Sequence, residues 1–347
     1  ITNSPLLTRG FYIGVEMGER LTSRKEYQGF YKDNEGEAHI VDMESRTLEP
    51  EVDTGDFIRQ AAPTIVRPSR RKRPTRSDSV TLAFGDAQIP FHDERALSLA
   101  LTAITEVQPD NVVLLGDMLD LPMQGRFLGR PEWANTVQSA IDRYHLFLAE
   151  IRARHIGRIA VIHGNHEERM PKMLRRDAAE LIGLRRANAE KELGVLTLSY
   201  LCRYDDLDVE AYTGYPNGRL WLEDNLQAIH GTETKRQGQS AVNYLKKEQV
   251  STLYGHDHRL AIAWQTRNTR LGGVACVAAS PGCLARTDGY VPSYAYSVDD
   301  MGDFVPRSED WQKGGLLILH NSRNHDVQPL RMSEQGINIG DKYYGNE

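Results

Sequence analysis

The sequence predicts an α/β domain with a largely buried sheet, and three observations lead to this prediction. From Val80 onward, apolar runs of strand length alternate with segments of helical periodicity, the pattern typical of α/β domains. Three of these runs end in a glycine followed by polar residues, at Gly85, Gly116 and Gly164. A chain of 347 residues with 40% hydrophobic composition can bury one large core or two modest ones.

The expected elements follow from hydrophobic periodicity and from the polar residues that separate them. In chain order, the first half is expected to form a strand over 80–84, a helix over 94–107, a strand over 111–115, a helix from about 133 to 154 and a strand over 158–162. The second half is expected to be richer in strands, at 195–200, 209–213, 226–230, 250–254, 260–264, 274–279 and 316–320, with helices near 170–191 and 240–247.

The chain before this domain has a different character. Residues 1–66 are polar and turn-rich, and they are expected to form an N-terminal appendage of unknown role with short strands near 29–31 and 38–41. A basic linker is expected over 67–78, because six of the ten residues from Arg67 to Arg76 are cationic and two are prolines. Two interpretations of it stay open, a solvated connector and an electrostatic contact with nucleic acid. The main domain is expected over 79–347.

Composition narrows the class of protein. No apolar run approaches the roughly 20 residues that cross a bilayer, and no secretory leader opens the chain, so we expect a cytoplasmic location and no membrane contact. Three cysteines are too few for a disulfide framework. The net charge of −6 argues against wrapping of nucleic acid by the whole surface. The oligomeric state stays open.

Polar clusters rich in metal-binding side chains follow the strand candidates. Ligands of α/β sheets gather at the carboxyl ends of strands, so these clusters are expected to share one site. Carboxylate, amide and imidazole ligands together suit first-row divalent ions, and one carboxylate can bridge two such ions; Asp117 is the candidate bridge. The five clusters are Gly85-Asp86-Ala87-Gln88, Gly116-Asp117-Met118-Leu119-Asp120, Gly164-Asn165-His166-Glu167, His230-Gly231 and Gly255-His256-Asp257-His258.

In this order the clusters resemble the calcineurin-like metallophosphoesterase superfamily, whose pattern is D-x-H, G-D-x-x-D, G-N-H-[ED], H and G-H-x-H. The resemblance covers about Val80 to His258. It implies a four-layer α/β/β/α sandwich of two mixed β-sheets flanked by helices. The sequence over 89–93 and 282–284 is also similar to that of phosphoesterases from bacteriophage genomes.

The resemblance implies two divalent metal ions that activate a water for attack on phosphorus. One ion would be held by Asp86, Gln88, Asp117 and His258. The other would be held by Asp117, Asn165, His230 and His256. His166 would orient or protonate the leaving oxygen, and Asp120 would orient the His166 ring.

One position departs from the family pattern, because Gln88 stands where the D-x-H histidine is expected. An amide oxygen is a weaker and harder donor than an imidazole nitrogen, so this site should bind less tightly and favour Mn or Mg over Zn. Manganese is the expected ion, with Fe, Zn, Ni and Mg as alternatives. Gln88 can instead be a packed polar residue that contacts no metal.

The expected activity is that of a phosphodiesterase or nuclease acting on nucleic acid or nucleotides. The basic linker, the similarity to phage sequences and His258 in the last motif favour a nucleic acid or nucleotide substrate. The alternatives are a phosphomonoesterase or protein phosphatase and, in another class, a nucleic-acid-binding or assembly protein with a vestigial site. Substrate phosphates are candidate partners for Arg126, Arg169, Lys235 and Arg259, which can also be merely solvated. An aromatic C-terminal stretch serves either base stacking or core packing; it holds Tyr290, Tyr294, Tyr296 and Trp311.

Overall fold

The structure is a computed structural model, and it divides the chain into two compact units, Ile1–Ala62 and Pro63–Glu347. In the first unit, β1 (Gln28–Lys32) pairs with β2 (Ala38–Asp42) as an antiparallel hairpin, so both predicted short strands are present. The described residues are 28–32, 38–42, 78–122, 136–189, 192–236, 238–270, 272–291, 296–298, 301, 304–306 and 309–345.

A six-stranded mixed sheet forms one half of the second unit, with the strand order β15-β14-β3-β4-β5-β6. Its central strands are parallel, while β14 runs antiparallel to β3 and β15 antiparallel to β14. Their bounds are β3 Ser79–Phe84, β4 Asn111–Leu114, β5 Arg158–Ile162, β6 Val209–Tyr212, β14 Gly314–His320 and β15 His325–Arg331.

A five-stranded mixed sheet forms the other half, with the order β10-β11-β9-β8-β7. Here β8, β9 and β11 are parallel, and β7 and β10 are antiparallel to their neighbours. The bounds are β7 Arg219–Glu223, β8 Leu226–Ile229, β9 Ser251–Tyr254, β10 Leu260–Thr269 and β11 Gly272–Pro281.

Side chains alternate between the two faces of each strand, so one core lies between the two sheets and another lies beneath the helices. In β3, Ala83 packs in the core between the sheets, whereas Leu82 and Phe84 pack in the core that also contains the helices. Successive side chains of a strand point to opposite faces, so a strand covered on both faces is apolar throughout. This is why the buried strands appear in the sequence as continuous apolar runs.

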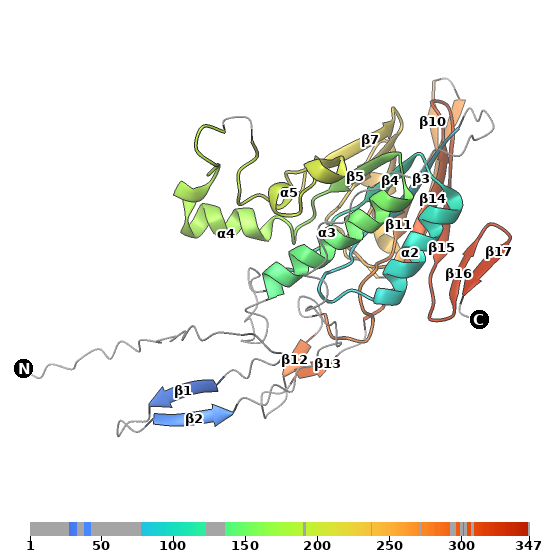
Figure 1. The fold of residues 1–347 in the computed structure, drawn as a ribbon. Coiled ribbons are helices and arrows are strands. Elements are labelled where there is room, and N and C mark those ends of the chain that lie inside the picture. The colour runs from blue at the N-terminus through green and yellow to red at the C-terminus, as the bar shows by residue number, and fades with distance from the viewer. Residues whose placement is uncertain are drawn as a thin grey trace, which may run out of the picture. The chain divides into compact units, whose positions relative to one another are not determined.

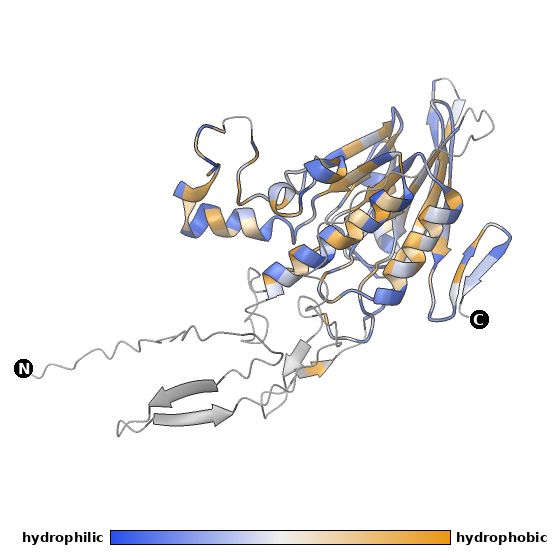
Figure 2. Cartoon of the chain, in the orientation of Figure 1, coloured by the Kyte–Doolittle hydropathy of each residue, from blue (hydrophilic) through white to orange (hydrophobic). Residues whose placement is uncertain are grey.

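Helices cover the outer faces of both sheets and complete four layers, and Figure 1 shows the two helices that lie over the six-stranded sheet. The apolar sides of α2 (Glu94–Val107) and α3 (Thr136–Arg154) pack in the core of the six-stranded sheet, while α6 (Gln239–Lys247) packs on β9 and β11. Figure 2 shows apolar residues concentrated along the strands and on one side of these helices. The predicted α/β/β/α sandwich is confirmed.

Two elements predicted from the sequence are wrong. The helix expected near 170–191 is only α4 (Arg169–Asp177), followed by the 3-10 turn Ala179–Leu181. The strand expected over 195–200 is absent, because the side chain of Thr197 accepts a hydrogen bond from the Tyr200 N–H and starts the short helix α5 (Leu198–Leu201). The predicted helix start at 133 lies outside the described residues, within which α3 begins at Thr136.

The remaining elements are short and lie outside the two main sheets. Two hairpins pair β12 (Tyr296–Val298) with β13 (Phe304–Pro306) and β16 (Gly336–Ile339) with β17 (Lys342–Gly345). A second 3-10 turn covers Asp205–Leu207. Among the described residues, none of the helices has both the length and the apolar character that crossing a membrane requires.

Candidate metal centre

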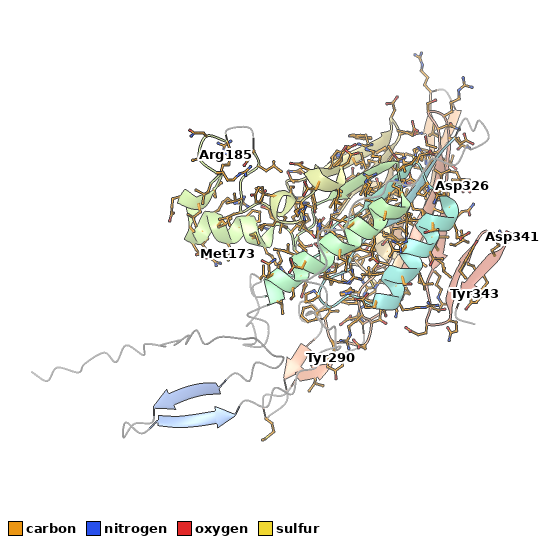
Figure 3. All side chains as sticks on the ribbon, in the orientation of Figure 1. Met173, Arg185, Tyr290, Asp326, Asp341 and Tyr343 are labelled. Atoms are coloured by element: carbon orange, nitrogen blue, oxygen red, sulfur yellow. The ribbon has the colours of Figure 1, made fainter. Side chains whose placement is uncertain are left out.

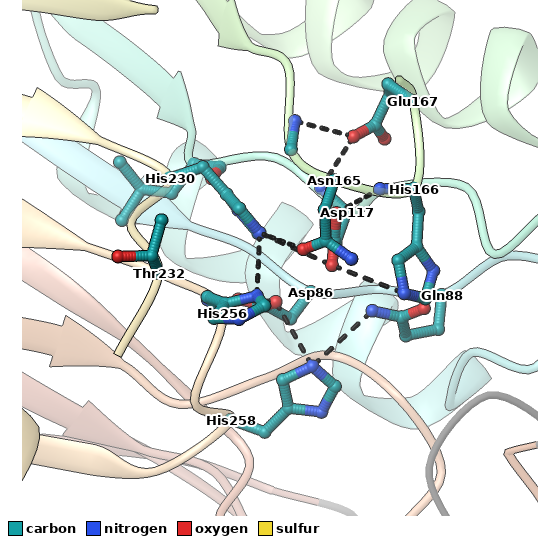
Figure 4. Close-up of polar contacts among 12 residues, drawn as sticks. Asp86, Gln88, Asp117, Asn165, His166, Glu167, His230, Thr232, His256 and His258 are labelled. Atoms are coloured by element: carbon teal, nitrogen blue, oxygen red, sulfur yellow. Dashed lines mark hydrogen bonds and ion pairs between the residues drawn. The ribbon is translucent and has the colours of Figure 1, made fainter. Parts of the chain in front are cut away.

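The loops that follow β3, β4, β5, β8 and β9 meet at one edge of the two sheets (Figure 4). The Asp86 N–H donates to the Gly116 carbonyl at 2.9 Å, and the Gln88 N–H donates to the Asp117 carbonyl at 3.0 Å. These contacts join the first two loops, as expected where the carboxyl ends of parallel strands lie side by side. All seven residues predicted as metal ligands lie in these loops: Asp86, Gln88, Asp117, Asn165, His230, His256 and His258.

Five of these residues have the left-handed backbone that L-residues rarely adopt. Their φ angles are 54° at Asp86, 55° at Gln88, 49° at Asp117, 74° at His256 and 59° at His258. Each such conformation costs on the order of 1–3 kcal/mol and is concentrated at functional sites in proteins. The loops therefore hold their side chains in positions that relaxed strand ends would not give.

Two glycines beside these loops leave room for carboxylates. A Cβ at Gly164 would lie 2.2 Å from Oδ1 of Asp117, and a Cβ at Gly255 would lie 2.8 Å from Oδ2 of Asp86. Both distances are under 3.0 Å, a separation that Cβ atoms essentially never show. Glycine is required at both positions because the backbone of one loop lies against the carboxylate of another.

Two groups of side chains bring their ligand atoms to within 4.8 Å of one another, and each group can hold a metal ion. One consists of Asp117, His230 and His256, and the other of Asp86, Asp117 and His258. Asp117 belongs to both groups, which is the geometry of a carboxylate between two ions. In the first group, Nε2 of His230 lies 3.3 Å from Oδ2 of Asp117 and 3.0 Å from Oδ1 of Asn165.

Gln88 lies beside the second group, and the surroundings of its side chain show whether a cation fits there. Its side chain is fully buried, and its Nε2 lies 3.4 Å from Nε2 of His258. Its Oε1 has no hydrogen-bond partner among the described residues. A buried acceptor without a donor costs about 1–3 kcal/mol, and a cation in this group would remove that cost. The amide oxygen therefore fits a metal ligand better than a packed polar group.

The two imidazoles of the first group have opposite electrostatic character. Burial lowers the pKa of His230, but the Asp117 carboxylate outweighs burial and brings this pKa to about 9. Burial and then the neighbouring His230 lower the pKa of His256 to about 4. The two rings are in contact, with His230 Nε2 3.2 Å from His256 Nδ1. Since a metal ion binds only neutral imidazole, metal binding at this group must displace the proton of His230.

His166 lies at the side of the cluster and is held by a carboxylate. Its Nδ1 is 2.8 Å from Oδ1 of Asp120, and its Nε2 is 3.6 Å from Oδ2 of Asp117. Arg169 approaches the same ring, with Nη2 2.9 Å from Nε2 of His166. The structure thus places His166, Asp120 and Arg169 together, with the ring Nε2 turned toward the ligand cluster.

The other predicted substrate contacts have different surroundings. The guanidinium of Arg259 is buried, donating to the Asp257 carbonyl at 2.9 Å and pairing with Asp310 at 3.3 Å. Lys235 is exposed before α6, and among the described residues no hydrogen bond or ion pair joins it to the cluster. Arg126 and the basic residues from Arg67 to Arg76 lie outside the described residues.

Glu167 is a buried residue of the site to which the sequence analysis assigned no role. Its Oε2 accepts the N–H groups of Asp117 and Gly164 at 2.9 and 2.8 Å, and its Oε1 accepts those of Met118 and Leu119 at 2.7 and 3.1 Å. Burial, and then the charge of Asp117, raise the pKa of this carboxyl. One side chain therefore fastens the loop after β4 to the loop after β5. Its place directly after His166 was the available signal.

Comparisons with known proteins place the chain in a family. The family described as Calcineurin-like phosphoesterase matches residues 80–260, which include every residue of the cluster. The chain belongs to the calcineurin-like phosphoesterase family. It is accordingly a metal-dependent enzyme that hydrolyses phosphoester bonds, as predicted.

Relatives with similar sequences come from bacteriophages. The Gene 54 protein of Mycobacterium phage D29 is 27% identical over 188 residues, covering 52% of this chain and 69% of the relative. The Gene 54 protein of Mycobacterium phage L5 is 25% identical over 185 residues, with the same coverage. The predicted similarity to phage proteins is confirmed.

The solved structures that resemble this chain have lower sequence identity to it than the phage proteins have. Vps29 from Entamoeba histolytica has 11% identity and a TM-score of 0.33, covering 77% of this chain and 99% of its own. A purple acid phosphatase from yellow lupin seeds has 12% identity and a TM-score of 0.36, covering 74% of this chain and 52% of its own.

Proposed function

We propose that this enzyme is a phosphodiesterase acting on nucleic acid or nucleotides, with two divalent ions held on either side of Asp117. The observation that carries the proposal is that Asp117 belongs to two ligand groups at once. One ion would be held by Asp86, Gln88, Asp117 and His258, and the other by Asp117, Asn165, His230 and His256. Manganese is the proposed ion, because Gln88 supplies an amide oxygen where the family pattern has an imidazole, and oxygen ligands favour Mn over Zn.

The chain's own residues position the substrate and move a proton. Paired divalent ions, when bound, lower the pKa of water and neutralise charge on phosphoryl oxygens. His166 donates a proton from Nε2 to the leaving oxygen, since this atom faces the cluster while Nδ1 is held by Asp120. Nη2 of Arg169 donates to the same nitrogen at 2.9 Å, so the protonated form of His166 requires this guanidinium to turn to another acceptor, and an oxygen of the substrate phosphate supplies one.

A panel of substrates tests the proposed function. With Mn bound, we expect hydrolysis of bis-p-nitrophenyl phosphate and of single-stranded DNA to exceed hydrolysis of p-nitrophenyl phosphate, with cyclic nucleotides and double-stranded DNA as further substrates. The matched background is the Asp117→Asn variant, purified in the same way. Activity on the monoester alone would reject the diesterase. No activity on any substrate, with metal bound, would favour a binding protein.

Replacing His166 is expected to slow the departure of the leaving group and to leave metal binding unchanged. The His166→Gln variant should bind Mn as the wild type does and lose about 10²- to 10⁴-fold in kcat on a dinucleotide, whose alkoxide leaving group needs a proton. The loss should be smaller with bis-p-nitrophenyl phosphate, because p-nitrophenolate leaves without one. Stopped assays of both substrates and a Mn titration give the result. Equal losses on the two substrates, or loss of Mn, would contradict this role.

A further inference from the structure

Two partly exposed aromatic rings lie against imidazoles of different ligand groups. Tyr215, in the loop between β6 and β7, has its ring centroid 5.7 Å from that of His230. Trp311, in the segment before β14, has its ring centroid 4.1 Å from that of His258. His230 and His258 belong to separate groups that share Asp117. An aromatic ring therefore adjoins each side of the proposed metal pair.

Packing explains only part of these two rings. Trp311 packs against the small buried cluster formed by Cys283, Ala285 and Val291, yet it stays partly exposed. Tyr215 likewise stays partly exposed beside a buried imidazole. Exposed aromatic faces next to a phosphate-binding centre are the surfaces on which nucleic acid bases stack.

A cationic group accompanies the Tyr215 ring. Nζ of the exposed Lys172, on α4, lies 5.8 Å from the centroid of the Tyr215 ring, and no carboxylate of the described residues forms an ion pair with it. Figure 3 shows Met173, the next residue of this helix, and Arg185 beyond it, on an arm that extends from the sheets. Lys172 is thus available to a backbone phosphate.

Beside Trp311 the surface is hollowed. A cavity of about 450 Å³ is lined by Arg259, Asp310 and Gln312, together with Gly238, Leu260, Ala261 and Ile262. Asp310 and Gln312 are the chain neighbours of Trp311, and the Gln312 N–H donates to the His258 carbonyl at 3.1 Å. A cavity of this volume, lined by the chain neighbours of Trp311 and of His258, has room for a nucleoside.

We propose that Tyr215 and Trp311 stack the bases of the two nucleotides that flank the scissile phosphate, so that the substrate is single-stranded nucleic acid cut internally. The proposal rests on the proposed phosphodiesterase function and names its substrate class. Bases within a duplex are already stacked on each other, so only a single strand offers them to the two rings. Stacking on aromatic rings tolerates any base, so little sequence preference is expected.

The reaction is hydrolysis and needs no further reagent. A water oxygen forms a bond to phosphorus as the water releases one proton to solvent, and the bond from phosphorus to one nucleoside oxygen breaks. The leaving oxygen takes the proton that His166 donates. The other nucleoside keeps the phosphate as a monoester. Lys172 binds the next phosphate along the strand on the Tyr215 side.

Dinucleotides with one base removed test this proposal, because they contain a single scissile bond. The substrates are dithymidine monophosphate, the two analogues with an abasic sugar on one side, and the doubly abasic analogue. Each is assayed with the Mn-loaded wild type and with the Tyr215→Leu and Trp311→Leu variants. Tyr215→Phe keeps the ring, and Trp221→Leu removes an exposed tryptophan of β7 (47% exposed) as a matched control.

We expect each leucine variant to lose roughly tenfold in kcat/KM on dithymidine monophosphate, the scale of one base–aromatic stack. Removing the base that stacks on the mutated ring should then cost nothing more, while removing the other base should still cost roughly tenfold. The doubly abasic substrate should be cut equally by all variants. Tyr215→Phe and Trp221→Leu should match the wild type.

Three outcomes would overturn the proposal. The wild type could cut full and abasic dinucleotides equally well. The leucine variants could lose equally on all four substrates. They could also lose Mn in a titration, which would make the rings supports of His230 and His258. In each case, continued hydrolysis of bis-p-nitrophenyl phosphate by the wild type would leave the proposed phosphodiesterase function standing.

Discussion

Replacing Glu167 by glutamine is expected to loosen both loops that carry Asp117 and Asn165, and to lower the affinity for Mn by about 10- to 100-fold. The carboxylate accepts four backbone N–H groups, two on each oxygen. Glutamine offers one oxygen, so two buried amides lose their acceptor. At about 1–3 kcal/mol for each, the free energy of unfolding should fall by about 2–6 kcal/mol.

The measurements are a Mn titration, kcat on bis-p-nitrophenyl phosphate and denaturant unfolding of the metal-free protein. Glu168→Gln is the matched control, because this neighbouring carboxylate pairs with Arg175 on α4 and contacts neither loop amide. It should behave as the wild type does. Wild-type metal affinity and stability in Glu167→Gln would show that the loops are held by other contacts.

Replacing Asp117 by asparagine should weaken both metal sites at once, whereas Gln88→Ala should weaken only one. Asp117 is fully buried and belongs to both ligand groups, while Gln88 adjoins only the group that contains His258. An amide cannot supply a negative charge to two cations. We expect Asp117→Asn to lose more than about 100-fold in kcat/KM, beyond the loss caused by an outer-sphere substitution.

A titration with Mn that is monitored by electron paramagnetic resonance distinguishes the two variants. The wild type should show two unequal affinities, because Gln88 is a weaker ligand than an imidazole. Gln88→Ala should lower the weaker affinity and keep the stronger one. If Asp117→Asn retained one ion with wild-type affinity, Asp117 would serve a single metal and not a pair.

Much of the fold followed from local patterns. Strands β3, β4 and β5 are covered on both faces, so they are apolar throughout and the sequence shows them clearly. Strand β7 was missed, because it lies at the edge of its sheet and alternates exposed Arg219 and Trp221 with buried Leu220. The strand predicted over 195–200 was wrong, because the side-chain cap at Thr197 starts a helix there despite the apolar composition of the segment.

The candidate site was predicted to a similar extent. A ligand that directly follows a buried strand is marked in the sequence by glycine and by residue type, and Asp86, Asp117 and Asn165 were found in this way. The role of Glu167 was not, because three of its four partners are backbone amides of another loop, and these leave no trace in residue types. Tyr215 was also missed, since nothing near it in the chain resembles a motif.

By itself, the sequence determined which strands are buried and which polar residues follow them, because side-chain alternation and strand ends are properties of neighbouring residues. Through the family resemblance it also predicted that these residues share one site, with Asp117 between the two ligand groups. Only the tertiary structure showed the left-handed backbone at Asp86, Asp117 and His258 and the approach of Trp311 to His258, which depend on strands from two sheets ending at one edge. Contacts between residues far apart in the chain are fixed by packing, and no local pattern encodes them.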